Sequence, residues 1–301
     1  MTPSDLATAE GSANDGRPAW LDADRYPFES RWADLPAGRL HYLDEGEGRP
    51  VVLLHGNPTW SFLYRRLVAE LSADYRCLAP DLLGFGLSEK PPTFSHRPAA
   101  HARVLRRFLD SLDLDGAVVA GHDWGGPLGF DYATRRPDRV AGFVTMNTWA
   151  WPRDRLRDRV VARTVAGRPG RALVGRYNAF ARVALAPAMV RHGRSARSVY
   201  RQYAAPLADP VARRGTWTLA GAVVDSRAWL ERLWDRRAAL AGTPVALLWG
   251  RRDPMHASLI RRWRAAFPDA SSVVYDDVGH FVPEEAEPRL AAAFRQFLNR
   301  V

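Results

Sequence analysis

The fold of this chain is decided at residues 116–126, which read GAVVAGHDWGG. The short apolar run is typical of a buried strand, and the residues after it can begin a helix. Small residues around Asp123 permit a tight strand-to-helix turn that presents its side chain at the carboxyl end of the strand. A carboxylate is already ionised at pH 7, so it can attack an electrophilic carbon directly and form an ester. The alternative interpretation is an aspartate that only caps the helix.

Short apolar runs alternate with helical patterns along the rest of the chain. We expect strands at residues 31–33, 40–43, 51–55, 76–79, 116–120, 140–146, 244–249 and 272–275, and helices at 60–71, 99–112, 124–135 and 284–298. This alternation predicts an α/β fold with a mostly parallel eight-stranded sheet flanked by helices and with an antiparallel edge.

The strand pattern is interrupted between residues 150 and 228, which we interpret as a helical cap inserted into the fold. Residues 19–149 and 229–301 would then form the α/β core. The polar residues 1–18 are expected to form a disordered tail without the features of a secretory signal.

The net charge of +10 is concentrated in the cap, because residues 153–201 contain 13 arginines and two acids. A solvated helical face is one interpretation. Others are a surface that draws anions toward a cleft, or one that faces a second subunit in a homo-oligomer. We expect no nucleic-acid partner, since no recognition motif accompanies the arginines.

Two further features concern the environment of the protein. No run of 18 apolar residues is present, so we expect no membrane partner. The single cysteine, Cys77, excludes an intramolecular disulfide framework and fits a reducing, cytoplasmic compartment.

A second motif, HGNP at residues 55–58, follows the third expected strand. In folds with such a turn, the backbone N–H of this loop and that of the residue after the nucleophile form an oxyanion hole. Here these residues are Asn57 and Trp124. Their side chains carry an amide N–H and an indole N–H, which suit a departing anion. The alternatives are a turn residue before proline and a packing aromatic.

The third motif is GHF at residues 279–281, between the last strand and the last helix. His280 stands where such a fold needs its base, and it would activate water against an ester on Asp123. Asp253 follows the penultimate strand and is the first choice for orienting His280. The competing position, after the strand that ends near residue 146, is Asn147, which cannot carry the charge.

With these residues in place, the chain resembles the haloalkane dehalogenases over roughly residues 28–300. The motifs that carry the resemblance are HGNPTW at 55–60, PDLLGFGLS at 80–88 and GHDWGG at 121–126. The resemblance implies the α/β-hydrolase fold and hydrolysis of halogenated aliphatic compounds to alcohol, halide and a proton, without metal or organic cofactor.

The same resemblance implies the roles of individual residues. Asp123 is the nucleophile, His280 the base and Asp253 the acid, while Asn57 and Trp124 bind the substrate's halogen and stabilise the halide. This combination is most similar to the third subfamily, whose members tend to form larger oligomers.

Two other functions remain open at this point. Soluble epoxide hydrolases share the GHDWGG motif, usually have an aromatic residue in place of Asn57, and need two cap tyrosines. Tyr177, Tyr200 and Tyr203 lie in the expected cap and keep that route available. A non-catalytic ligand sensor on the same fold is the other alternative, although the complete set of catalytic residue types argues against it.

Overall fold

The computed structural model describes residues 17–301 except 113, 154, 190–192, 194 and 255–257. The predicted tail therefore lies almost entirely outside the described residues. Eight strands form one sheet in the order β1-β2-β4-β3-β5-β6-β7-β8. They are β1 (Arg31–Leu35), β2 (Gly38–Glu45), β3 (Pro50–Leu54), β4 (Arg76–Pro80), β5 (Ala117–His122), β6 (Val140–Met146), β7 (Val245–Gly250) and β8 (Ser271–Tyr275).

The predicted mostly parallel sheet is confirmed. Strand β2 pairs antiparallel with both β1 and β4, and all the remaining pairs are parallel. Every residue of β5 is buried, which explains why its sequence is continuously apolar rather than alternating. Because β3, β5, β6 and β7 run parallel, their carboxyl ends meet at one edge of the sheet, where the sequence motifs lie.

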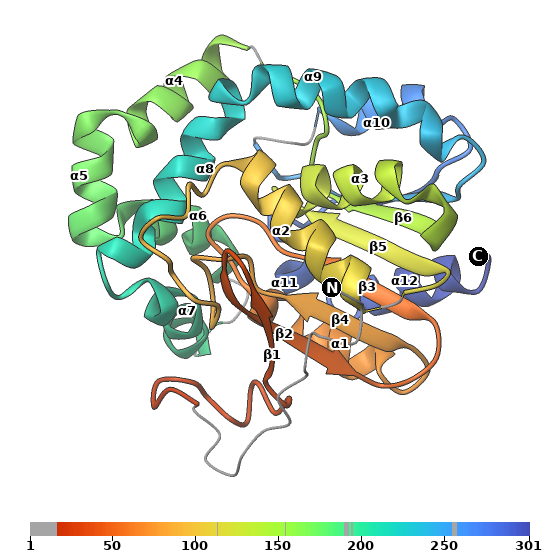
Figure 1. The fold of residues 1–301 in the computed structure, drawn as a ribbon, viewed down its shortest axis with the longest axis horizontal. Coiled ribbons are helices and arrows are strands. Elements are labelled where there is room, and N and C mark those ends of the chain that lie inside the picture. The colour runs from red at the N-terminus through yellow and green to blue at the C-terminus, as the bar shows by residue number, and fades with distance from the viewer. Residues whose placement is uncertain (1–16, 113, 154, 190–192, 194, 255–257) are drawn as a thin grey trace.

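Helices cover both faces of the sheet (Figure 1). The core helices are α1 (Arg65–Leu71), α2 (Pro98–Ser111), α3 (Gly125–Arg135), α9 (Arg227–Asp235), α10 (Ile260–Ala266), α11 (Val282–Glu285) and α12 (Arg289–Leu298). Apolar side chains of α2, α3, α9 and α10 build one buried cluster, and those of α1, α11 and α12 build the other. Each face of the sheet therefore has its own hydrophobic core.

One helix boundary differs from the prediction. The single helix expected over residues 284–298 is divided into α11 and α12, and Pro288 lies between them. Proline has no N–H to donate and its ring clashes with the preceding turn, so the helix is interrupted at this residue. The helical spacing of the apolar residues continues across the break and does not reveal it.

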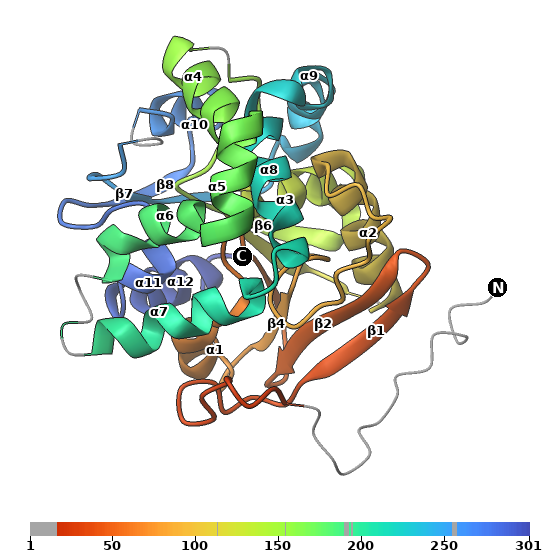
Figure 2. The ribbon, with the colours of Figure 1, turned by 90° about the vertical axis from the view of Figure 1, so that its left-hand side faces the viewer.

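Between β6 and β7 the chain forms α4 (Leu156–Ala166), α5 (Arg168–Tyr177), α6 (Ala179–Met189), α7 (Ala196–Ala204) and α8 (Arg214–Asp225). Helices α4, α5, α6 and α7 form the face turned toward the viewer in Figure 2. Helix α5 packs against α4, α6 and α8. None of the described helices is long and apolar enough to cross a membrane.

A buried polar contact joins this inserted region to the core. Arg65 in α1 forms an ion pair of 2.6 Å with Glu284 in α11, and the Tyr203 hydroxyl of α7 donates to the same carboxylate. A buried charge is costly unless it is paired and hydrogen-bonded, so this cluster fixes where α7 docks.

Candidate active site

The turn at Asp123 has the geometry that the sequence predicts for a nucleophile. Strand β5 ends at His122, helix α3 begins at Gly125, and Asp123 between them has a φ of +50°. A Cβ atom on Gly125 would lie 1.9 Å from the carbonyl oxygen of Leu54, so only glycine fits there. A left-handed non-glycine residue costs on the order of 1–3 kcal/mol, which the surrounding packing must offset.

The side chain of Asp123 lies at the carboxyl edge of the sheet and is only 11% exposed. The backbone N–H of Asn57 donates to its Oδ1 over 2.9 Å. Its Oδ2 lies 3.7 Å from Nε2 of His280, which is longer than a hydrogen bond. Gly56 allows this close approach, because a Cβ there would lie 2.4 Å from Oδ1.

His280 is oriented by Asp253. The Nδ1–H of His280 donates to Oδ2 of Asp253 over 2.9 Å, and the Asp253 side chain is completely buried. Burial alone would lower the pKa of His280, but the charge of Asp253, its hydrogen bond and the charge of Asp123 together raise that pKa above 6.5. Nε2 therefore faces Asp123, with a carboxylate behind the ring that stabilises the imidazolium.

The loop that carries His280 is held by side chains that sequence analysis did not assign. The carboxylate of Glu285 accepts the N–H of Gly279 over 2.8 Å and that of Phe281 over 3.0 Å. Glu285 also adds to the negative charge that raises the pKa of His280. An acidic residue five positions after a histidine is the only sequence signal, and it is too common to identify the role.

Two further side chains, those of Asn147 and His122, also hold the histidine loop in place. Asn147, which occupies the competing acid position with a φ of +39°, donates from Nδ2 to the Gly279 carbonyl and accepts the Gly250 N–H at Oδ1, each over 2.9 Å. His122 donates from Nε2 to the carbonyl of His280 over 2.8 Å. Asn147 thus joins the ends of β6 and β7 to the histidine loop.

The two expected halide donors point at helix α8. Nδ2 of Asn57 donates to the carbonyl of Thr216 over 3.0 Å, and Nε1 of Trp124 donates to the carbonyl of Leu219 over 3.1 Å. Both carbonyls belong to helix α8, which contributes to the wall of the site. The structure therefore brings the two donors to the nucleophile and gives both a bond to the same cap helix.

A cavity of about 370 Å³ lies between the inserted helices and the sheet. It is lined by Asn57, Asp123, Trp124, Trp149, Asp158, Val161, Ala162, Phe180, Val183, Ala184, Pro187, Ala220, Val223, Arg252, Asp253, Pro254, Gly279, His280 and Phe281. Its wall is largely apolar, with polar groups gathered at Asp123. Such a cavity suits a small apolar molecule that carries one reactive carbon.

The cap tyrosines take no part in this lining. Within the described part of the chain, no tyrosine lines the cavity. Tyr203 is buried and bonded to Glu284, and Tyr177 is half exposed on the surface. The tyrosine donors that the epoxide hydrolase route needs are therefore missing from the described wall.

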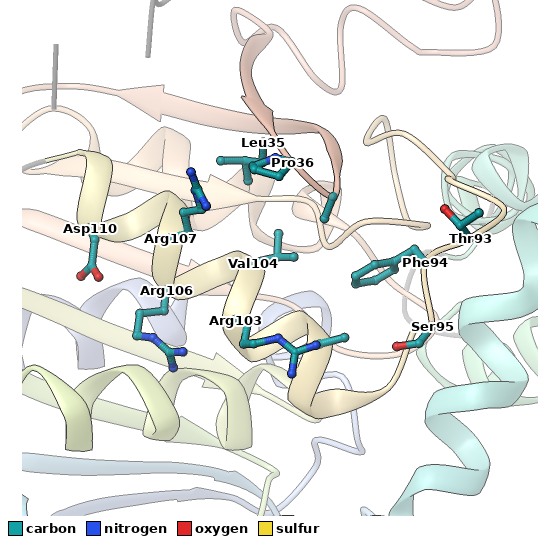
Figure 3. Close-up of a pocket in the computed structure, with 12 residues that line it drawn as sticks. Leu35, Pro36, Thr93, Phe94, Ser95, Arg103, Val104, Arg106, Arg107 and Asp110 are labelled. Atoms are coloured by element: carbon teal, nitrogen blue, oxygen red, sulfur yellow. The ribbon is translucent and has the colours of Figure 1, made fainter. Parts of the chain in front are cut away.

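A second, larger hollow lies away from this site, between the β1–β2 hairpin and α2 (Figure 3). Arg103, Arg106 and Arg107 of α2 line one side of it, and Leu35 and Phe94 line the other. None of the five residues expected at the active site lines this hollow. We therefore assign it no part in the chemistry.

Comparisons with known proteins identify relatives of this chain. A family model described as alpha/beta hydrolase fold matches residues 49–287. Haloalkane dehalogenase 2 of Mycobacterium tuberculosis is 43% identical over 275 residues, covering 90% of this chain and 96% of that protein. A cis-3-alkyl-4-alkyloxetan-2-one decarboxylase of Xanthomonas campestris is 34% identical, covering 91% and 97%.

A solved structure supports the same fold. Haloalkane dehalogenase DatA from Agrobacterium tumefaciens C58 superposes with a TM-score of 0.79 at 22% identity, covering 93% of this chain and 99% of that one. The chain therefore belongs to the α/β hydrolases and, among them, to the haloalkane dehalogenase family.

Proposed function

We propose that this enzyme cleaves carbon–halogen bonds of halogenated aliphatic compounds through an ester on Asp123, with His280 as base and Asp253 as its orienting acid. The observation that carries the proposal is the joint geometry of these three side chains at the apolar cavity. The combination with Asn57 and Trp124 suggests the third subfamily, and an assembly of several copies is part of that proposal.

In the first step, a carboxylate oxygen of Asp123 attacks the carbon that bears the halogen. A new C–O bond forms while the carbon–halogen bond breaks, and the halide leaves with the bonding electrons. The low exposure of Asp123 favours attack, because few water molecules solvate the carboxylate. No proton has to be removed from the nucleophile.

The leaving halide would accept hydrogen bonds from the side-chain N–H groups of Asn57 and Trp124. Each group has a 3.0–3.1 Å bond to an α8 carbonyl, and the Asn57 amide carries a second N–H. The Trp124 indole has one N–H, so it must give up its hydrogen bond to the Leu219 carbonyl in order to bind the halide. Halide binding at Trp124 is therefore linked to a small displacement of the indole or of α8.

In the second step, His280 takes a proton from water, and the resulting hydroxide attacks the carbonyl carbon of the Asp123 ester. The Asn57 N–H, which already donates to Oδ1, stabilises the oxyanion. The tetrahedral intermediate collapses and releases the alcohol, while Asp253 stabilises the imidazolium. The proton then leaves to solvent.

The test is halide release from a panel of brominated alkanes by the purified protein. We expect turnover, and we expect His280→Phe to release one equivalent of halide and to retain the alkyl group on Asp123, seen by intact mass. Trp124→Phe should weaken halide binding without preventing ester hydrolysis. Absence of any adduct across the panel would indicate a ligand sensor. Turnover of styrene oxide alone would favour an epoxide hydrolase.

One relative motivates a second substrate class for the same nucleophile. The Xanthomonas relative is named for a strained four-membered lactone, and Asp123 could open such a ring at its alkyl carbon. The higher identity to a dehalogenase favours halide chemistry. The assay should therefore include a cis-dialkyl oxetanone, and conversion of this compound without halide release from any bromide would overturn our assignment.

A further inference from the structure

Exposed apolar side chains are concentrated on three helices of the inserted region. Of the seven large apolar side chains that are exposed in the described part of the chain, six lie on α4, α5 and α6. They are Leu156, Val160, Val161, Leu173, Tyr177 and Val183. Leu156 is 71% exposed and Val183 is 75% exposed, which is unusual for aliphatic residues on packed helices.

The same three helices carry an excess of positive charge at the surface. Arg159 and Arg163 are four residues apart and share one side of α4, Arg155 precedes the helix as its N-cap, and all three are exposed. Exposed arginines also lie on α5 and α6. Asp158, the described acid of this segment, is buried in an ion pair of 2.7 Å with Arg153 and does not offset this charge.

This surface also forms the rim of the active-site cavity. Val161 of α4 and Val183 of α6 are exposed and line the cavity at the same time. Part of the cavity wall is therefore solvent-exposed on α4 and α6, two of the helices that carry these apolar residues and arginines and that face the viewer in Figure 2.

We propose that α4, α5 and α6 dock on an anionic lipid surface and thereby place the mouth of the cavity against the bilayer. Arginines interleaved with exposed aliphatic residues are the composition of surfaces that bind anionic membranes from one side. The absence of a long apolar helix from the described residues agrees with docking without insertion. The lack of an 18-residue apolar run in the sequence bears on spanning helices and not on docking at the surface of a bilayer.

Two other occupants fit this face less well. A nucleic acid would neutralise the arginines but gain little from exposed Leu156, Leu173 and Val183, since such interfaces are polar. A second copy docked face to face would bring the two arginine clusters together, and like charges repel. A lipid surface satisfies both the charge and the apolar side chains.

Docking would have a consequence for catalysis that rests on the proposed function. Long-chain halogenated alkanes partition into lipid, so a cavity that opens on the bilayer receives them without passage through water. Short soluble bromides need no such route. Binding to vesicles and turnover of short bromides are separate measurements, so either idea can fail without the other.

The experiment is sedimentation of the full-length protein with vesicles of phosphatidylcholine alone or with one third phosphatidylglycerol. We expect binding only to the anionic vesicles, weakened by salt. Each arginine near an anionic surface contributes about fivefold in affinity, so Arg159→Gln, Arg163→Gln and Arg182→Gln together should lower it about 100-fold. Leu156→Ser with Leu173→Ser should also weaken binding, and neither residue lines the cavity.

A matched control removes three exposed arginines at positions 97, 103 and 107, the first at the N-cap of α2 and the others within it, and should leave vesicle binding within about twofold of the starting protein. All variants should turn over a short bromide at the original rate. The proposal is overturned if the protein ignores anionic vesicles. It is also overturned if heparin or DNA binds as tightly and the leucine variants change nothing, or if light scattering shows that the leucine variants only dissociate an oligomer.

Discussion

Replacing Asp253 by asparagine should separate the two chemical steps. The substitution keeps the shape of a completely buried side chain but removes the charge 2.9 Å from Nδ1 of His280. At that distance, with an effective dielectric constant of about 20, the charge stabilises an imidazolium by roughly 6 kcal/mol. One decade in rate corresponds to about 1.4 kcal/mol, so ester hydrolysis should slow by roughly 10⁴-fold.

The first step should survive this change, because attack by Asp123 needs no base. Rapid mixing with a bromoalkane should give a burst of one equivalent of bromide, followed by very slow turnover. Intact mass should show the alkyl-enzyme throughout the slow phase. Asp276→Asn provides a matched control, because Asp276 is 78% exposed in its pair with Arg251, and steady-state turnover should be unchanged.

Two results would refute this reasoning. Loss of the burst would mean that Asp253 acts before the ester forms. Steady-state turnover close to that of the starting enzyme would mean that another group orients His280.

Three further predictions concern Glu285, His280 and Glu287. Glu285→Gln should slow ester hydrolysis about 10–100-fold with an intact burst, because the amide offers an N–H donor to one of the two backbone N–H groups that the carboxylate now accepts. The substitution should also lower the pKa of His280, because it removes a nearby negative charge. An unchanged pH profile would mean that Glu285 has only a structural role. In the free enzyme, His280 should titrate above pH 6.5 by NMR, and Asp123→Asn should lower this value, since the charge of Asp123 contributes to the raised pKa. The alkyl-enzyme lacks this charge because Asp123 is then an uncharged ester, so ester hydrolysis should be lost as pH falls through a lower pKa than that of the free enzyme; equal pKa values in the two states would contradict the assignment. Burial raises the pKa of Glu287 from 4.5 to about 7. The native state therefore binds this proton more tightly than the unfolded state, and the free energy of unfolding should fall as pH rises from 4.5 to 7. Glu287→Gln should raise Tm at pH 8 but not at pH 4, with at most about 3 kcal/mol of stabilisation, and equal effects at both pH values would contradict the assignment.

Local sequence patterns predicted the sheet and the turn that carries the proposed nucleophile. The residues 116–126 predict a buried strand, a tight turn that the glycines permit and the start of a helix. Such information is local, because burial on both faces and backbone geometry act on neighbouring residues. The break at Pro288 was missed because apolar spacing continued through it.

Only the tertiary structure decided how the site is supported and enclosed. Glu285 and Asn147 hold the histidine loop through backbone N–H and carbonyl groups, which leave no side-chain pattern to read. The bonds from Asn57 and Trp124 to α8 join residues more than 90 positions apart. The hydroxyl of Tyr203 donates to Glu284, 81 positions away in the sequence, and Tyr203 does not line the cavity. The sequence records which groups are available, but long-range packing determines which of them meet, because helices of similar composition can present different faces to the core.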